Sequence, residues 1–121
     1  MKKIRDDIKM ISVVMSTYKE EERLLRQAIE SILNQTYTDF EYIIILDFPD
    51  NEMHKRVIHE YASKDHRIQF YINEKNIGLT DSLNRGLSLC HGDYIARMDA
   101  DDISLPDRLE RQLKYLEKND F

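Results

Sequence analysis

The chain has 121 residues, enough for one domain. Hydrophobic residues make up 41% and charged residues 34%, which is typical of a domain with a buried core and a charged surface. The net charge of -5 argues against nucleic acid as the main partner, because binding to a phosphate backbone requires a basic surface. A small phosphorylated ligand that is bridged by a cation is compatible with this negative charge.

Residues 1–9 are expected to be a leader outside the fold, because their charges are of both signs and the apolar stretch that follows is too short for a signal peptide or a membrane span. Residues 10–16 form a short β-branched apolar run, which predicts a buried strand. Residues 20–35 show helical spacing of apolar residues and begin with acids, which the helix dipole favours at that end.

Residues 41–47 predict a second strand, and Asp50 or Asn51 is expected to cap the helix after it. The apolar face of that helix consists of Met53, Val57, Ile58, Tyr61 and Ala62. Residues 67–73 alternate between apolar and polar side chains and predict a third strand.

A third helix is predicted next, and Gly92 is expected to cap its C-terminus. Its apolar stripe consists of Leu79, Leu83, Leu87 and Cys90. A short fourth strand is predicted over residues 94–98. Ser104 is expected to cap a fourth helix with Pro106 in its first turn. The buried stripe of that helix consists of Leu105, Leu109, Leu113 and Leu116.

Strands and helices therefore alternate four times, which predicts an α/β fold with a mostly parallel sheet of about four strands and helices on both faces. The unpaired edge of such a sheet could support self-association. Cys90 is the single cysteine, so the chain can form no internal disulfide and a cytoplasmic setting is expected. The four histidines lack metal-ligand spacing and are assigned no role.

Polar residues follow each predicted strand, and parallel strands bring such positions to one edge of the sheet, where ligands bind. Thr17 could cap the first helix or contact a ligand, and Tyr18 could pack in the fold or stack on a planar base. The main role expected of Glu20 is to stabilise the N-terminus of the first helix, and contact with a ligand is its second possible role. Asp47 reads as a turn former or a ligand contact, and residues 73–78 read as a turn.

Three aspartates follow the fourth strand within four positions. Because Ser104 is expected to provide the helix cap, Asp99 and Asp101 are left without a structural role. Two carboxylates one residue apart can hold Mg²⁺ or Mn²⁺, with substrate phosphates completing the shell. An EF-hand loop from Asp99 fails because Ile103 and Ser104 occupy the positions of an acidic residue and a glycine. Dinucleotide-binding and P-loop motifs fail because the chain has only three glycines.

Three motifs in this order resemble the N-terminal half of family 2 glycosyltransferases of the GT-A fold, from about Ile11 to the end of the chain. The motifs are "ISVVMSTYKEEERLLRQAIESILNQTYTDFEYIIILD", "NIGLTDSLNRGLSLCHGDYIARMDADD" and "LPDRLERQ". The resemblance implies that residues 10–121 are the Rossmann-like half domain that binds a nucleotide-diphospho-sugar, usually a UDP-sugar, with Mn²⁺ or Mg²⁺ for an inverting transfer.

By the same resemblance, Ser16, Thr17, Tyr18 and Glu20 line the nucleotide pocket, and Asp47 accepts a hydrogen bond from the base. Asp99 faces the ribose and the metal ion, and Asp101 is the metal ligand. Asp102 supports the turn, and Asn84 matches a position near the donor.

The sequence departs from the family pattern at three places. The family often has two consecutive aspartates at the second strand, and Leu46 replaces the first of them. Phe48-Pro49-Asp50 replaces the common Asp-Gly-Ser. Leu83 replaces the arginine that often precedes the position of Asn84. No residue matches the family's general base, which is expected beyond residue 121 in the half that binds the acceptor, a glycan or a lipid-linked sugar. The full protein would then work in the cytoplasm, at the inner face of a membrane for a lipid-linked acceptor. The alternative is a non-catalytic nucleotide-binding or assembly module.

Overall fold

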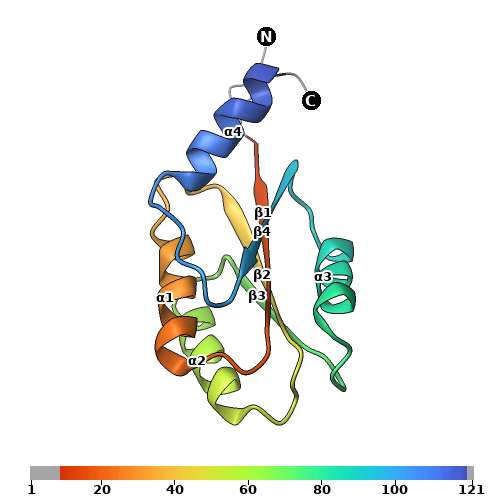
Figure 1. The fold of residues 1–121 in the computed structure, drawn as a ribbon. Helices are drawn as coiled ribbons and strands as arrows, with labels where there is room; N and C mark the ends of the chain where they lie inside the picture. Colours follow the sequence, from red (N-terminus) through yellow and green to blue (C-terminus); the bar gives the residue numbers. More distant parts are fainter. Residues whose placement is uncertain (1–8, 120–121) are drawn as a thin grey trace.

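The computed structural model describes residues 9–119, and in them four strands alternate with four helices (Figure 1). The predicted leader lies outside the described residues except for Lys9. In chain order, the elements are β1 (Ile11–Thr17), α1 (Glu22–Leu33), β2 (Phe40–Leu46), α2 (Glu52–Ala62), β3 (Ile68–Ile72), α3 (Leu79–Ser88), β4 (Tyr94–Asp99) and α4 (Arg108–Asn119).

The four strands form one sheet in the order β3-β2-β1-β4, and every neighbouring pair is parallel. This confirms the predicted α/β fold and all four predicted strands. Strand β1 is central and fully buried because both of its faces are covered by helices, which is why its sequence is a nearly continuous apolar run.

Helices cover both faces of the sheet, with α1 and α2 on one face and α3 on the other (Figure 1). Val13 and Met15 of β1 belong to the core cluster with α1 and α2. Val14 points the other way, towards α3, because successive side chains of a strand alternate between faces. A Cβ at Gly86 of α3 would lie 2.5 Å from Val14 Cγ1, so only glycine allows the helix to approach β1 this closely.

Helix α3 packs differently from the prediction. Leu79 is 51% exposed and Leu87 is 44% exposed, and the buried residues of the helix are Ser82, Leu83 and Gly86. The helix ends at Ser88, so the prediction that Gly92 caps it is wrong. Gly92 instead packs against β1, where a Cβ would lie 2.7 Å from the backbone nitrogen of Ser12.

Helix α4 begins at Arg108, so the predictions that Ser104 caps it and that Pro106 lies in its first turn are wrong. Gln35, two residues after the end of α1, provides the cap because its Oε1 accepts a hydrogen bond from the backbone N–H of Leu109 at 3.0 Å. Ser104 Oγ accepts from the Arg108 guanidinium at 3.0 Å. Of the predicted stripe, Leu109 and Leu113 are buried, Leu116 is half-buried and Leu105 is 65% exposed.

The predicted N-cap of α2 is confirmed. Asn51 accepts a hydrogen bond through Oδ1 from the backbone N–H of His54 at 3.0 Å.

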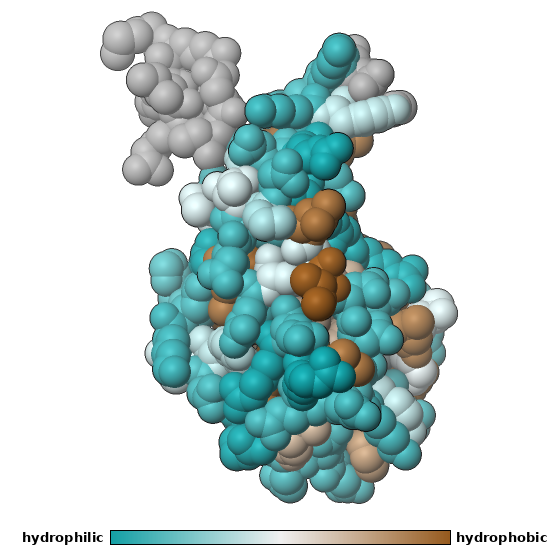
Figure 2. Space-filling view, turned by 60° about the vertical axis from the view of Figure 1, so that its left-hand side comes forward, coloured by the Kyte–Doolittle hydropathy of each residue, from teal (hydrophilic) through white to brown (hydrophobic). Residues whose placement is uncertain are grey.

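The surface in Figure 2 is mainly hydrophilic, with a few hydrophobic side chains exposed near its middle. No helix within residues 9–119 combines the length and the apolar character needed to cross a membrane.

Candidate functional site

The carboxyl ends of β1, β2 and β4 lie side by side, as the parallel sheet predicts. Ser16 is the register partner of Asp99 on one side and of Ile45 on the other. The backbone N–H of Asp47 donates to the oxygen of Thr17 at 2.8 Å. The structure therefore brings Ser16, Thr17, Asp47 and Asp99 to one edge of the sheet.

The loop after β1 is fixed in place by hydrogen bonds. Glu20 Oε1 accepts from the backbone N–H of Tyr18 at 2.8 Å, and Asn51 Nδ2 donates to the Tyr18 oxygen at 2.8 Å. Thr17 does not cap α1, because the N-cap position is Glu21 and has no side-chain capping bond. The Thr17 side chain is fully buried, and its hydroxyl has no hydrogen-bond partner within residues 9–119. Tyr18 is 39% exposed, which leaves its ring accessible to a ligand.

His54 belongs to the same arrangement and was missed from the sequence. Its side chain is fully buried, and Nε2 lies 2.7 Å from the backbone oxygen of Glu20. Because a carbonyl oxygen only accepts, Nε2 carries the proton. The spacing of His54 to Val57 and Ile58, three and four residues on, could have placed it on the buried face of α2.

An aromatic pair stands at the ends of β1 and β2. The rings of Tyr18 and Phe48 lie 5.5 Å apart between centroids, with an angle of 51° between their planes. The Lys19 ammonium lies 5.0 Å from the Tyr18 ring and 5.1 Å from the Phe48 ring. Phe48 and Lys19 were not among the predicted site residues, although each is adjacent in sequence to one of them.

The aspartates after β4 form an exposed turn. The backbone N–H of Asp102 donates to the Asp99 oxygen at 3.1 Å, which closes the turn without using the Asp102 side chain. The Asp99 side chain is 52% exposed and lies 3.8 Å from the Arg97 guanidinium. Within residues 9–119, the exposed Asp101 carboxylate has no hydrogen-bond or ion-pair partner.

The residues that could hold a divalent cation are few. Among residues 9–119, no group of three or more His, Cys, Asp or Glu side chains is arranged to hold a metal ion. Asp99 and Asp101 nevertheless fit Mg²⁺ or Mn²⁺ chemically, because they present exposed carboxylates and these ions commonly take one or two carboxylates together with substrate phosphates. The turn can therefore contribute to a cation site that a phosphorylated ligand completes.

A groove of about 210 Å³ runs between α3 and β4 on the same face of the sheet as Asp99. Asn84, Thr80 and Arg97 are its polar lining residues, and leucine, isoleucine and valine side chains form the rest. The structure thus places Asn84 near Arg97, a residue that was not predicted. Alternation along β4 puts Arg97 on the face of Asp99, which is the signal that could have identified it.

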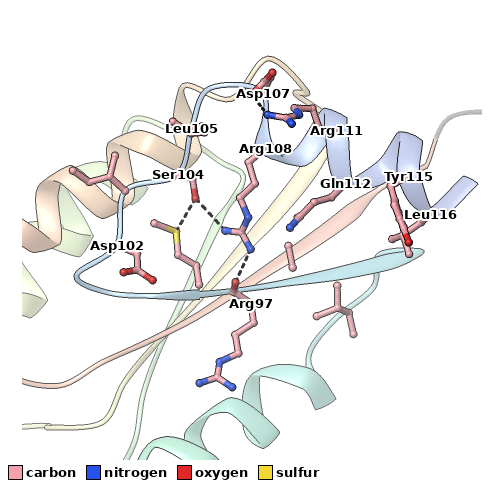
Figure 3. A pocket seen from close by; sticks show the side chains of 14 residues that line it. Arg97, Asp102, Ser104, Leu105, Asp107, Arg108, Arg111, Gln112, Tyr115 and Leu116 are labelled. Carbon is pink, nitrogen blue, oxygen red and sulfur yellow. Dashed lines mark hydrogen bonds and ion pairs between the residues drawn. The ribbon is translucent and has the colours of Figure 1, made fainter.

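A larger open hollow of about 1020 Å³ lies along the outer edge of β4, between the strand and α4 (Figure 3). Arg108 crosses it and donates to the backbone oxygen of Arg97 at 2.7 Å. Of the predicted aspartates only Asp102 lines it. Ser16, Thr17, Asp47 and Asp99 do not line this hollow, whereas Ile95 and Arg97 line both the hollow and the groove beside α3.

Comparison with known proteins identifies relatives of the chain. The family model described as glycosyl transferase family 2 matches residues 12–121. The chain is 51% identical over 113 residues to the uncharacterized glycosyltransferase MJ1057 of Methanocaldococcus jannaschii, covering 93% of this chain and 39% of the relative. It is 45% identical over 114 residues to the O-antigen biosynthesis glycosyltransferase WbnJ of Escherichia coli, covering 93% of this chain and 43% of the relative.

Solved structures share the fold at low sequence identity. S. aureus TarS 1–349 in complex with UDP-GlcNAc superposes with a TM-score of 0.80 at 20% identity, over 89% of this chain and 31% of that one. The mannosyltransferase PcManGT from Pyrobaculum calidifontis, in complex with GDP-Man and Mn²⁺, gives a TM-score of 0.78 at 20% identity, over 88% of this chain and 32% of that one. The chain thus spans less than half the length of each of these proteins.

Proposed function

Because the chain belongs to glycosyl transferase family 2, we propose that it is the donor-binding part of a glycosyltransferase and binds a nucleotide-diphospho-sugar. The observation that carries the proposal is the pairing of Ser16 with Asp99 at the carboxyl end of the sheet, next to the unengaged carboxylate of Asp101. Polar side chains and carboxylates lie together at the edge where open α/β sheets bind ligands, which supports assigning them to a nucleotide and a cation.

The nucleotide would lie over the loop after β1. Ser16, Tyr18 and Glu20 would line its pocket, with Tyr18 offering an exposed ring to the base. Thr17 would shape the pocket from beneath, because the whole residue is buried. Asn84 would meet the donor from α3.

Asp101, assisted by Asp99, would hold Mn²⁺ or Mg²⁺ against the diphosphate. When bound, the cation supplies charge neutralisation of the diphosphate as the leaving group. The two carboxylates alone would repel a diphosphate, so the proposal requires donor affinity to depend on the cation.

The sugar would be transferred with inversion to a glycan or a lipid-linked acceptor. We place the general base that deprotonates the acceptor hydroxyl outside this chain, in the additional length that the relatives have. The proposed donor is a UDP-sugar, and the proposed process is polysaccharide biosynthesis. The proposed location is the cytoplasm, at the inner face of the membrane when the acceptor is lipid-linked. The relative that is named for O-antigen biosynthesis supports the choice of glycan. Self-association through the outer edge of β4 is a further proposal.

Calorimetric titration of this chain with UDP and with GDP, each with Mn²⁺, with Mg²⁺ and with a chelator, tests the proposal. We expect binding that depends on the cation and is stronger for UDP. Cation-independent binding would favour a non-catalytic nucleotide-binding module. No binding of either nucleotide with either metal ion would contradict a donor site in this chain.

A further inference from the structure

The segment between β4 and α4 returns along helix α1 (Figure 1). Ala100, at its start, is 2% exposed and belongs to the core cluster, and Ser104 is 9% exposed. Asp101, Asp102 and Ile103 lie between these two buried residues and are themselves exposed. The proposed cation ligand Asp101 therefore belongs to a short exposed loop that is anchored at both ends.

The anchor after the loop is provided by α1 and the residues that follow it. Ser31 Oγ accepts from the backbone N–H of Ser104 at 3.0 Å and donates to the backbone oxygen of Ala28 at 2.8 Å. Gln35 Nε2 donates to the backbone oxygen of Leu105 at 2.6 Å. Because both contacts engage the main chain of the segment, they fix its path directly.

Gln35 is the centre of this anchor, and its side chain is buried, with 3% of the residue exposed. Besides the bond to Leu105, its Nε2 donates to the backbone oxygen of Ser31 at 3.0 Å, and its Oε1 accepts from the backbone N–H of Leu109 at 3.0 Å. An amide has two N–H donors, so both are in use. The side chain therefore joins three segments: the end of α1, the return segment and the first turn of α4.

The order of this segment matters for the proposed cation site. A ligand residue on a disordered loop must be ordered when the cation binds, and the entropy lost in that step lowers the affinity. In the part of the chain that the structure describes, the Asp101 carboxylate has no hydrogen-bond or ion-pair partner, so the main chain alone sets its position. Anchoring the main chain in advance removes part of the entropic cost.

We infer that Gln35, assisted by Ser31, is a positioning residue for the cation site, because it holds the segment after β4 and so orders Asp101 before the cation arrives. The part of the inference that concerns the cation rests on the proposed function. The part that concerns the order of the segment does not, because its hydrogen bonds are present without a ligand.

Amide hydrogen exchange of the ligand-free chain, followed by NMR, tests the order of the segment. Gln35→Met keeps the length of the side chain and removes its hydrogen bonds. Exchange at Ser104 and Asp102, which do not contact the Gln35 side chain, should become at least about tenfold faster relative to Ile44 in the core of β2. Unchanged relative rates at both residues would overturn the inference.

Gln69→Met is the matched control, because it removes a glutamine hydrogen bond at another place, between β3 and Glu41. It should leave the relative exchange rates at Ser104 and Asp102 unchanged. An acceleration as large as in Gln35→Met would show that any loss of stability loosens the segment, and would overturn the inference.

Ser31→Ala provides a milder second variant in case Gln35→Met does not fold. It removes the acceptor of the Ser104 N–H and leaves the bonds of the Gln35 side chain in place. Exchange at Ser104 should become faster, and the acceleration should extend to Asp102. If exchange at Asp102 stays unchanged, the anchor does not order the loop and the inference fails.

Titration with UDP in the presence of Mn²⁺ and in the presence of a chelator tests the part that concerns the cation. It is carried out at a temperature where circular dichroism shows each variant to be folded. Gln35→Met should weaken binding at least about tenfold with Mn²⁺ and should have no effect with the chelator, whereas Gln69→Met should change neither.

The other outcomes of this titration separate the two proposals. An unchanged affinity of Gln35→Met with Mn²⁺, or an equal loss with Mn²⁺ and with the chelator, would overturn a role in positioning the cation ligand. If the unaltered chain does not bind UDP with Mn²⁺, the proposed function fails, while the exchange rates still decide whether Gln35 orders the segment.

Discussion

The Nε2 atom of His54, on α2, lies 2.7 Å from the backbone oxygen of Glu20 in the loop after β1. This buried hydrogen bond joins α2 to the loop that carries Tyr18. It makes the shape of the proposed nucleotide pocket depend on a side chain that would not itself touch the nucleotide.

His54→Ala should destabilise the chain by about 2–4 kcal/mol, because it removes a buried side chain and leaves the Glu20 oxygen without this donor. Urea denaturation measures the change in the free energy of unfolding. His66→Ala, at an exposed histidine, should cost less than about 0.5 kcal/mol. A loss of similar size in both variants would show that the buried hydrogen bond contributes little.

Asp101→Asn should reduce the affinity for UDP at least about tenfold in the presence of Mn²⁺, since a neutral amide is a weaker ligand for a hard cation than a carboxylate. In the presence of a chelator, the variant and the unaltered chain should bind UDP equally. Asp102→Asn is the matched control, because only the backbone of Asp102 takes part in the turn. Equal losses in the two variants would point to a general charge effect instead of a specific ligand.

Stability should fall as the solution is made acidic, and Glu41 should account for part of the loss. Burial alone would raise the pKa of the Glu41 carboxyl, but hydrogen bonds donated by Ser12, His91 and Gln69 outweigh it and hold the pKa below the usual value of 4.5. A carboxyl whose pKa is lowered by folding stabilises the fold above its unfolded pKa, and this contribution disappears as the pH falls through the folded pKa.

Urea midpoints measured from pH 7 down to about pH 3 for the unaltered chain and Glu41→Gln test this assignment. Glu41→Gln should be less stable at pH 7 and should show a shallower fall below about pH 4.5. Glu74→Gln, at an exposed glutamate, should follow the unaltered chain. Parallel curves for the unaltered chain and Glu41→Gln would assign the acid sensitivity to other carboxyl groups.

Gly86→Ala should destabilise the fold by about 1–3 kcal/mol, because the added methyl group would meet Val14 Cγ1 at 2.5 Å inside a packed interface. Thermal unfolding measures the cost. Combining it with Val14→Ala makes room for the methyl group, so the double variant should lose less stability than the sum of the two single variants. Strict additivity would mean that the contact with Val14 does not account for the cost of Gly86→Ala.

Strands β1 and β2 could be predicted from the sequence because burial on both faces favours continuous apolar runs such as residues 42–46. Most helix ends could not, and the N-cap of α2 at Asn51 is the exception. Ser104 and Thr17 have suitable side chains for local caps, but α4 is capped by Gln35 and the N-cap position of α1 has no side-chain capping bond. At the start of α3, the backbone N–H of Gly78 donates to Asp47, which is also distant in sequence. Local patterns do not contain such partners.

The packing face of α3 was predicted wrongly for a related reason. Helical spacing favoured the leucine stripe that includes Leu79 and Leu87, yet the helix approaches the sheet through Ser82 and Gly86. Small residues permit that close approach, and hydrophobicity alone does not identify them. The prediction that four segments would converge succeeded because it depended only on the parallel order of the strands.

The position of β4 beside β1 has a consequence for the order of events during synthesis. Strands β1, β2 and β3 are neighbours in sequence and can pair as soon as they leave the ribosome, whereas β4 must close a loop from residue 17 to residue 94 before it pairs with β1. Asp99 and Ser16 meet only at that last step. A nascent chain that has not yet docked β4 would therefore have most of its core but would lack the proposed donor site, so nucleotide binding would report on completed folding.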